Sequence, residues 1–306
     1  ISYQTAFLKT YYPKEFIAAS MTMDISNQNK LSEFFEELKR LGINVKRPDI
    51  NECYADFQSN EKNFFYALGA IKNVGYDAIL NIVNERDKNG KFLSIIDFIN
   101  RVNPKDINKL QLEGLVKAGA FDNIIQNRRS LYESIPSIIL KSKNNHENKI
   151  ANQINLFETN EIENNGVISF IDDWDFDVKL SKEFEALGFY ISDHPLNQYS
   201  DVLGDYEIIS FENFNNNKNI HAANIAGTVL KVQQKKTQKG NSYAIVKFSD
   251  LKSVFELFIF SDLLELNRDI ISDGNSLILN LTKNTTEENN RFKKINVKSL
   301  SSLRSM

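Results

Sequence analysis

The sequence predicts a multidomain chain in which helices come first and strands come last. Apolar residues recur at helical spacing through roughly the first 140 positions, where glycines interrupt them at tight turns. From Ala223 onward the period becomes strand-like. A polar, asparagine-rich stretch after Lys141 separates the two patterns. The predicted fold class is therefore α-helical domains followed by a small β-domain.

Composition limits the kinds of partner and site. A chain of 306 residues can hold two or three domains with their own cores. Lys and Arg number 37 against 40 Asp and Glu, a net charge of −3, so nucleic acid has to be met by local basic patches or by backbone groups. The single cysteine, Cys53, excludes an internal disulfide and a multi-cysteine zinc site, which favours a cytoplasmic location. No apolar run approaches the roughly 20 residues that cross a bilayer, so no membrane partner is expected.

The first 60 residues are predicted to be helices joined by a turn at Leu41 and Gly42. Phe7, Tyr11 and Phe16 are apolar positions of the opening helix. Because the chain begins inside this pattern, we expect it to be part of a longer protein. The apolar stripe of the next helix consists of Leu31, Phe34, Phe35, Leu38 and Leu41.

The most informative stretch is 65–84, where a glycine-bounded turn lies between two apolar helical runs. Gly69 and Gly75 bound the turn, and the second helix begins at Tyr76. The first amides of a helix are unpaired and lie at the positive end of its dipole, so they can grip a nucleic-acid backbone without reading its sequence. The predicted duplex contacts are Lys72, Asn73, Val74, Gly75 and Tyr76. The alternative is an ordinary helical hairpin whose glycines only permit a tight turn.

A related pattern follows at 107–124, and two tandem hairpins are rarer by chance than one. Its apolar face breaks around Gly119, and Lys117 and Gly119 are the predicted duplex contacts. Ala118 and Ala120 flank Gly119 where a double-glycine turn would have a second glycine. Whether this turn contacts DNA or only packs therefore stays open.

The stretch 63–129 resembles the tandem helix-hairpin-helix region of the bacterial replicative DNA polymerase III alpha subunit, a C-family DNA polymerase. The matching words are LGAIKNVG, FLSIIDFINRV, NKLQLEGLVKAGAFD and NRRSLYESI, and SYQTAFLKTYYPKEFIAASMT, LGINVKRPDINECYADF and LGFYISDHPLNQY extend the resemblance over nearly the whole chain. It implies an end of the fingers at 1–60, tandem hairpins that bind duplex DNA at 61–140, a linker with a clamp-binding peptide at 141–180, a helical connector at 181–222 and a nucleic-acid-binding OB-fold domain at 223–306.

A short peptide follows the linker and has no helix or strand period of its own. Its residues are Gln153, Ile154, Asn155, Leu156 and Phe157. A glutamine followed three and four residues later by Leu and Phe can insert one amide and two apolar side chains into a pocket. The peptide resembles the sliding-clamp-binding motif of bacterial polymerases and lies where that family carries it. The alternative is that its Leu and Phe only fix the linker to a neighbouring domain.

Five short strands are predicted after Ala223, with one helix between the third and the fourth. The strands lie at 224–234, 242–250, 254–260, 276–283 and 291–300, and the helix at 262–271. This order is the outline of a five-stranded OB-fold barrel. The polymerase family carries such a domain at this place.

Two loops and one face of this barrel suit single-stranded DNA. On the second strand Tyr243 and Lys247 lie opposite the face of Ala244, Val246 and Phe248. If the second set is core, the tyrosine stands beside a lysine, which favours base stacking with phosphate pairing. The predicted contacts are Lys235, Lys236, Lys239, Tyr243, Lys247 and Arg291, with Phe258 a weaker candidate. The alternative is a solvated basic loop with a half-buried tyrosine.

Other polar residues are interpreted as structural. The acidic cluster Asp172, Asp173, Asp175 and Asp177 precedes a helix and is interpreted as a solvated approach to its N-terminus, not as a metal site. Asp49 lacks a second aspartate two residues on, since Asn51 occupies that position. His194 precedes Pro195 with no nucleophile or orienting carboxylate evident nearby.

Nucleotidyl transfer needs metal-binding carboxylates, and the sequence shows no such constellation. The resemblance therefore implies part of a DNA-directed DNA polymerase of DNA replication, inactive alone, with no cofactor here and Mg²⁺ expected in a palm domain outside this sequence. The implied partners are duplex and single-stranded DNA, the sliding clamp (beta subunit) and other polymerase III holoenzyme subunits. Two alternatives are a non-enzymatic adaptor that joins DNA to a clamp, and an error-prone polymerase of the same family.

Overall fold

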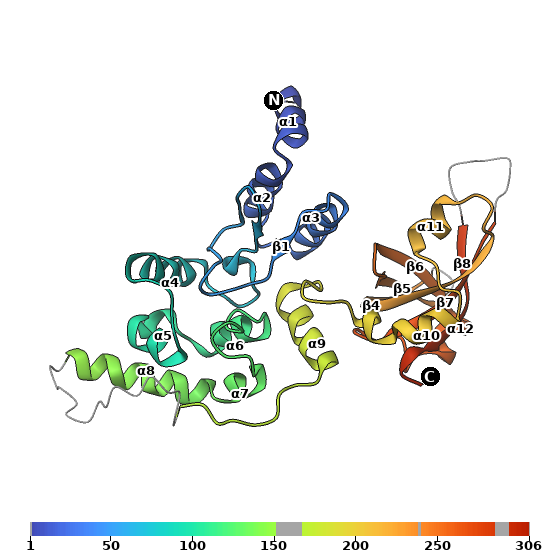
Figure 1. Ribbon diagram of the computed structural model, residues 1–306. Coiled ribbons are helices and arrows are strands. Elements are labelled where there is room, and N and C mark those ends of the chain that lie inside the picture. Colours follow the sequence, from blue (N-terminus) through green and yellow to red (C-terminus); the bar gives the residue numbers. More distant parts are fainter. Residues whose placement is uncertain (1, 151–166, 238–239, 285–293, 306) are drawn as a thin grey trace. The chain divides into compact units, whose positions relative to one another are not determined.

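The computed structural model divides into two compact units, Ile1–Ser192 and Asp193–Met306, called here the first and second unit (Figure 1). The structure describes residues 2–150, 167–237, 240–284 and 294–305. The predicted connector 181–222 is divided between the two units.

The first unit opens with three helices, α1 (Ser2–Tyr11), α2 (Pro13–Met23) and α3 (Gln28–Arg40). Pro13 begins α2, a position where the missing N–H of proline is no loss. After α3, Gly42 has φ 68°, and the amides of Gly42 and Ile43 donate back to Lys39 and Leu38. This Schellman motif ends the helix and confirms the turn predicted at Leu41 and Gly42.

A small sheet follows where the sequence pattern predicted helix. It consists of β1 (Val45–Lys46), β2 (Gln58–Ser59) and β3 (Phe64–Phe65), in the order β1-β3-β2. Only a 3-10 turn, η1 (Leu68–Ala70), stands before the glycine turn. The prediction of helix through residue 60 and of a helical run before the turn is therefore wrong. Phe64 and Tyr66 are buried and Phe65 is half-buried, so strand alternation decides this segment.

Six further elements build the rest of the predicted hairpin domain. They are α4 (Tyr76–Asn89), α5 (Ile95–Arg101), η2 (Pro104–Asp106), α6 (Lys109–Lys117), α7 (Arg128–Glu133) and α8 (Ile135–Ile150). The side chains of Ser94, Asn108 and Asn127 cap α5, α6 and α7 by accepting from the amide three residues on. One hydrophobic core runs through these helices and through α2 and α3 of the opening segment.

Helix α8 extends into residues 142–150, which the sequence pattern predicted as flexible linker. That prediction is wrong for these residues. Ser142 is buried, and Asn145 Nδ2 donates to Asn100 Oδ1 at 2.6 Å, so the helix stays attached to α5. The stretch contains no glycine or proline that would stop it.

Helix α9 (Phe176–Leu187) packs on the first unit. Ala186 and Leu187 join its core, and the Phe189 ring stacks on Phe35 with centroids 4.5 Å apart. Gly188, with φ 85°, ends the helix. The first part of the predicted connector thus contributes to the hairpin domain.

The second unit is a five-stranded antiparallel sheet preceded by short helices. The helices are η3 (Pro195–Tyr199), α10 (Ser200–Asp205) and α11 (Phe211–Asn216). The strands are β4 (Ala222–Lys236), β5 (Ser242–Ser249), β6 (Val254–Phe260), β7 (Ser276–Asn284) and β8 (Lys294–Ser302), with α12 (Ser261–Leu266) after β6 and η4 (Leu303–Ser305) at the end. These bounds confirm the five predicted strands and the helix between the third and fourth.

The sheet has the order β6-β5-β4-β7-β8, in which β4 is shared by two halves. Residues 222–228 of β4 pair with β7, and residues 228–236 pair with β5. Cα atoms of β6 and β8 come within 8 Å of each other, but the two strands share no hydrogen-bonded pair among the described residues. The sheet is therefore OB-like in order and is not closed into the predicted barrel. None of the described helices could span a membrane.

Candidate nucleic-acid interfaces

The turn before α4 has several backbone amides without an internal acceptor. Asn73 has φ 63°, in the left-handed region that asparagine tolerates better than most residues. In the described part of the chain, the amides of Asn73, Tyr76, Asp77 and Ala78 make no hydrogen bond. The last three open a helix of 14 residues, where backbone N–H groups and the dipole favour an anion.

Other parts of the first unit hold this turn in place. The Lys72 amide donates to Ala186 O of α9 at 3.0 Å. The Gly75 amide donates to Gln111 Oε1 of α6 at 3.4 Å, and the Val74 amide donates to Ile71 O at 3.2 Å, so three of the five predicted turn contacts have their amides occupied here. A Cβ on Gly114 of α6 would lie 2.7 Å from Lys72 O, which explains the glycine there. The turn is therefore braced from two helices.

The two glycines of the predicted turn differ in role. A Cβ on Gly69 would lie 2.7 Å from Ala55 O, so this glycine allows a close backbone contact. Gly75 has φ −75°, and a Cβ there would meet nothing nearer than Gln111 Oε1 at 3.6 Å. Gly75 is thus not required for packing, and its missing side chain leaves the approach to the α4 amides open.

Acidic side chains surround this turn. The Tyr76 hydroxyl donates to Asp56 Oδ2 at 2.9 Å, a hydrogen bond that raises the pKa of Tyr76. Asp77 stands in the first turn of α4. Anion attraction here comes from the backbone, and these two carboxylates oppose it.

The second predicted turn is filled by its own chain. Gly119 has φ 78°, and the amides of Gly119 and Ala120 donate to Val116 O at 3.0 Å and Leu115 O at 2.9 Å. A Cβ on Gly119 would lie 2.3 Å from Nη2 of Arg128, whose guanidinium is buried. Arg128 Nε and Nη2 donate to the two Asp122 oxygens at 2.8 and 2.6 Å. The amides of Gly119 and Ala120 are therefore occupied, whereas those of Phe121 and Asn123 make no hydrogen bond in the described chain.

The helix after this turn also has an internal partner. The Arg129 amide at the start of α7 donates to Asp173 Oδ1 at 3.1 Å. Burial raises the pKa of Asp173, but its 2.5 Å ion pair with Lys179 and two backbone amides outweigh burial and lower that pKa. Asp173 therefore accepts from the N-terminus of α7, whereas the sequence pattern assigned the whole acidic cluster to the N-terminus of the following helix.

Two other polar residues have structural partners. Asp49 accepts from the Asn51 amide at 2.6 Å and from the Asn123 side chain. His194 Nδ1 accepts from the Leu196 amide at 3.2 Å, and its Nε2 lies 3.1 Å from Ser249 Oγ. Among the residues that the structure describes, no group of three acidic, histidine or cysteine side chains could hold a metal ion.

The sheet of the second unit presents a mixed aromatic and basic outer face. Ala244, Val246 and Phe248 are fully buried, so the alternate residues of β5 point away from the core. The register places Lys235 opposite Tyr243, and Phe258 opposite Ile245. The outer face consists of Lys231, Gln233, Lys235, Tyr243, Ile245, Lys247, Glu256, Phe258 and Phe260.

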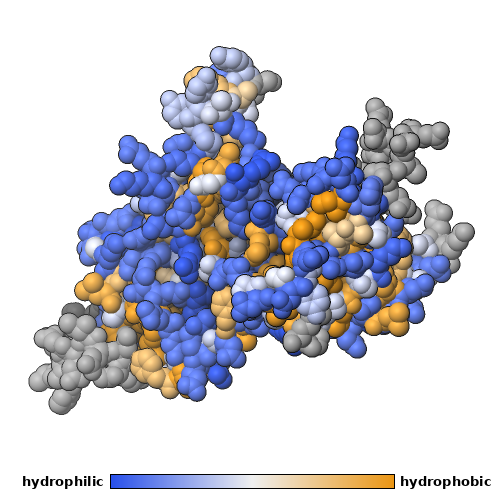
Figure 2. All heavy atoms as spheres, turned by 45° about the vertical axis from the view of Figure 1, so that its right-hand side comes forward, coloured by the Kyte–Doolittle hydropathy of each residue, from blue (hydrophilic) through white to orange (hydrophobic). Residues whose placement is uncertain are grey.

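Aromatic rings are exposed on this outer face. Phe258 and Phe260 are 51% and 54% exposed, values that are high for phenylalanine in a sheet. The Tyr243 and Phe258 rings lie with centroids 6.3 Å apart and planes 25° apart. Figure 2 shows that apolar side chains form patches among polar ones on the visible surface.

The predicted single-strand contacts are divided by the structure. Lys235, Tyr243 and Lys247 share the outer face, whereas Lys236 pairs with Ser242 in the alternate register. Lys239, Arg291 and the peptide Gln153, Ile154, Asn155, Leu156 and Phe157 lie outside the described residues. Sequence reasoning missed Lys231, which the pairing of β4 with β5 brings to this face, and Phe260, which alternation with Phe258 along β6 could have placed there.

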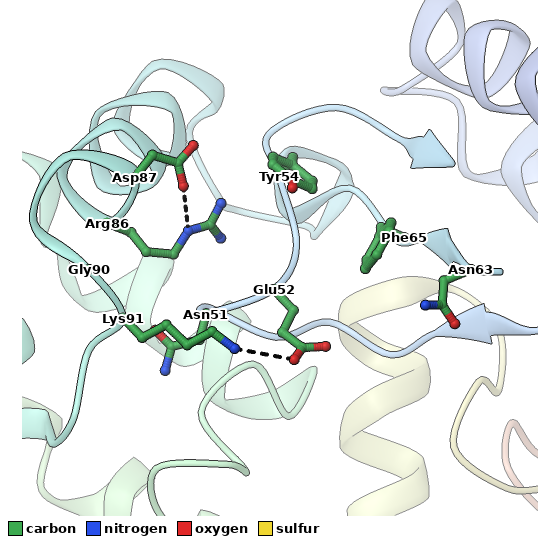
Figure 3. A pocket seen from close by; sticks show the side chains of 9 residues that line it. All are labelled: Asn51, Glu52, Tyr54, Asn63, Phe65, Arg86, Asp87, Gly90 and Lys91. Atoms are coloured by element: carbon green, nitrogen blue, oxygen red, sulfur yellow. Dashed lines mark hydrogen bonds and ion pairs between the residues drawn. The ribbon is translucent and has the colours of Figure 1, made fainter. Parts of the chain in front are cut away.

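A polar pocket of about 450 Å³ lies beside the small sheet (Figure 3). It is lined by Asn51, Glu52, Tyr54, Asn63, Phe65, Arg86, Asp87, Gly90 and Lys91. Its charges are paired: Arg86 Nε lies 2.9 Å from Asp87, and Lys91 Nζ lies 3.4 Å from Glu52. The buried Arg86 guanidinium also donates to Ile50 O, so the pocket has no unpaired charge to offer a ligand.

Comparison with known proteins gives consistent matches. Residues 42–131 match a family model described as a helix-hairpin-helix motif. The chain is 33% identical over 294 residues to "DNA polymerase III subunit alpha" of Caulobacter vibrioides, covering 95% of this chain and 26% of the relative. The protein of the same name from Borreliella burgdorferi is 34% identical over 282 residues, covering 90% of this chain and 24% of the relative. The protein of that name from Buchnera aphidicola subsp. Schizaphis graminum is 34% identical over 297 residues, covering 93% of this chain and 25% of the relative. The chain spans about a quarter of the length of these curated relatives.

Proposed function

We propose that this chain, a segment of the DNA polymerase III alpha subunit family, is a part that holds DNA for a DNA-directed DNA polymerase. Its own residues would bind duplex and single-stranded DNA during replication. The carboxylates that hold Mg²⁺ for nucleotidyl transfer would belong to a palm domain outside this sequence, and this chain alone would be inactive.

The observation that carries the proposal is the turn before α4. Asn73 and the first three residues of α4 have amides without acceptors in the described chain, and α6 and α9 brace the turn in that conformation. A duplex backbone would place a phosphate oxygen at these amides, and Lys72 would add a longer-range charge. Such a contact is independent of base sequence, as replication requires.

The outer face of the second unit would bind unpaired template. Exposed rings at Phe258 and Phe260 offer stacking surfaces to bases of any sequence, and Lys231, Lys235 and Lys247 offer charges to the backbone. Glu256 on the same face opposes phosphate and weakens the contact. Binding should therefore be modest and sensitive to salt.

The peptide Gln153, Ile154, Asn155, Leu156 and Phe157 would bind the sliding clamp. A clamp that encircles DNA would hold the tethered chain at an effective concentration on the order of millimolar, so processivity would need no new chemistry. Changing Gln153, Leu156 and Phe157 together to alanine should abolish clamp binding with duplex affinity nearly unchanged. Equal clamp affinity of both proteins would exclude this tether. Other polymerase III subunits and a cytoplasmic location belong to the same proposal.

The test is a fluorescence-anisotropy titration of the chain with primer-template duplex and with single-stranded DNA at two salt concentrations. Gly75→Val should weaken duplex binding at unchanged helix content, because the branched side chain obstructs the α4 amides while φ −75° suits valine. Lys88→Ala, at the far end of α4, is the control. Duplex binding that is equal in Gly75→Val and in the control would contradict the proposal.

A further inference from the structure

We propose that α9 extends the duplex interface with a second phosphate site, in which Lys72, Lys117 and Lys182 surround Glu185. This inference rests on the proposed duplex binding of the first unit. The three lysines are called the lysine cluster. Neither Lys182 nor Glu185 was among the residues predicted from sequence, because both lie beyond the predicted hairpin domain, which ends at 140, in a stretch expected to be a connector.

The geometry of the cluster is set by α6 and α9. Lys117 Nζ, near the end of α6, lies 2.7 Å from Glu185 Oε1. Lys182 Nζ lies 3.4 Å from the other carboxylate oxygen. Lys72 is anchored beside them, because its amide donates to the carbonyl of Ala186, the residue after Glu185. The cluster is thus continuous with the braced turn before α4.

Positive charge is in excess within this cluster. Glu185 provides one carboxylate for three ammonium groups, and Lys72 has no ion pair within 4.0 Å among the described residues. The charge of Glu185 still acts on Lys72, although partial burial dominates and lowers the pKa of that lysine. The next acid, Glu113, lies 3.8 Å from Lys109. Within the cluster three ammonium groups face one carboxylate, and the charge of Glu113 also acts on Lys117, so a smaller positive excess remains to attract an anion.

Glu185 occupies the place that a phosphate oxygen would take. A carboxylate and a phosphate accept the same charge-assisted hydrogen bonds from lysine. Burial raises the pKa of Glu185, but the hydrogen bond and charge of Lys117 outweigh burial and lower that pKa. The carboxylate is therefore ionised at neutral pH, and its side chain is 54% exposed, so it can turn away from the lysines toward water.

Duplex DNA is the ligand that fits both features. Lys72 belongs to the turn whose open amides would take one phosphate, and the cluster begins at that same residue. Successive phosphates of one backbone can therefore meet the turn and the cluster. Glu185 would compete with the second phosphate and limit affinity, which lets the chain release and advance.

The experiment compares full-chain variants for binding to a primer-template duplex across a salt series. Lys182→Ala should lower the slope of log affinity against log salt by about 0.9, the value for one lost phosphate contact. Glu185→Gln should tighten binding and raise that slope by up to about 0.9, because Lys117 and Lys182 lose their internal anion. Lys88→Ala is the matched control, with no expected change.

The outcomes separate this inference from the proposed function. A wild-type chain without salt-sensitive duplex binding would overturn both. If Gly75→Val weakens binding while Lys182→Ala behaves like Lys88→Ala, only the lysine cluster is excluded. Weaker duplex binding by Glu185→Gln at an unchanged midpoint of thermal unfolding would also overturn the inference. If Glu185 were only structural, the same substitution should lower that midpoint. A larger effect on single-stranded DNA than on duplex would reassign the ligand and overturn the inference as stated.

Discussion

The two hairpin turns of the first unit contain similar residues and differ in what fills them. Before α4, the amides of Tyr76 and Asp77 have no acceptor in the described chain. After α6, the guanidinium of Arg128 covers Gly119, and Asp173 accepts a hydrogen bond from the Arg129 amide at the start of α7. The glycine therefore marks a turn in both cases, but only an unfilled turn can bind a phosphate. Under the proposed function, the first hairpin is therefore the one that would bind a phosphate, and the second would mainly pack.

The largest expected effect comes from emptying the second turn. Arg128→Ala removes a buried guanidinium that donates to Asp122 and to Lys117 O, so the free energy of unfolding should fall by about 3 kcal/mol. The exposed neighbour Arg129→Ala should cost less than 1 kcal/mol. Denaturant unfolding measures both changes. A large loss of duplex affinity by folded Arg128→Ala, but not by Arg129→Ala, would show that the second hairpin contacts DNA after all.

Exchanging each glycine for alanine sharpens the comparison. Gly119→Ala places a Cβ at φ 78° against Arg128 and should destabilise the chain by about 1–3 kcal/mol. Gly75→Ala has φ −75° and meets only ordinary van der Waals contacts, so the change at this N-cap should cost no more than about 1 kcal/mol of unfolding free energy. Equal effects on thermal unfolding would contradict the assignment of different roles.

Asp173→Asn tests the internal partner of α7. The lost charge, which pairs with Lys179 and lies at the N-terminus of α7, should cost roughly 1 kcal/mol at neutral pH. The folded state lowers the pKa of Asp173, so its stabilisation is present above the unfolded pKa and is lost as pH falls through the folded value. The difference in unfolding free energy between the two proteins should therefore shrink below about pH 4. A difference that stays constant with pH would exclude this charge effect.

The smallest expected effect is at the first turn itself. Asp77→Asn removes a carboxylate beside the open amides, so duplex affinity should rise a few-fold at low salt. The helix should lose about 0.5 kcal/mol of dipole stabilisation in the same variant. Anisotropy titration and thermal unfolding measure the two changes. Asp87→Asn, at the other end of α4, should not raise affinity.

Residue spacing within one segment predicted the elements whose structure that segment sets by itself. The start of α4 at Tyr76 and the alternation of β5 followed from residue spacing alone. The small sheet was missed because β1 and β3 pair across a long connection, and two-residue strands have no period. The helical residues 142–150 were missed because their attachment to α5 depends on one tertiary hydrogen bond.

The candidate site residues were likewise predictable only where their neighbours in sequence place them. Lys72 and Tyr243 could be named from their neighbours in sequence, and the structure puts them on a braced turn and an outer face. Other contacts depend on packing between different elements. The Arg128 guanidinium lies against Gly119, and Glu185 of α9 contacts Lys117 of α6. Spacing within α9 indicates only the Lys182–Glu185 pair, at i and i+3, and neither the contact of Glu185 with Lys117 nor the position of Arg128.

The bond between the Lys72 amide and Ala186 O has a consequence for synthesis on the ribosome. The turn and α4 leave the ribosome early, but the helix that receives the Lys72 amide is made only after α8 and the segment beyond it. A nascent chain that ends at α8 has the sequence of the first hairpin without one of its two braces. We expect the ability to grip DNA to mature late in translation, when α9 emerges and docks.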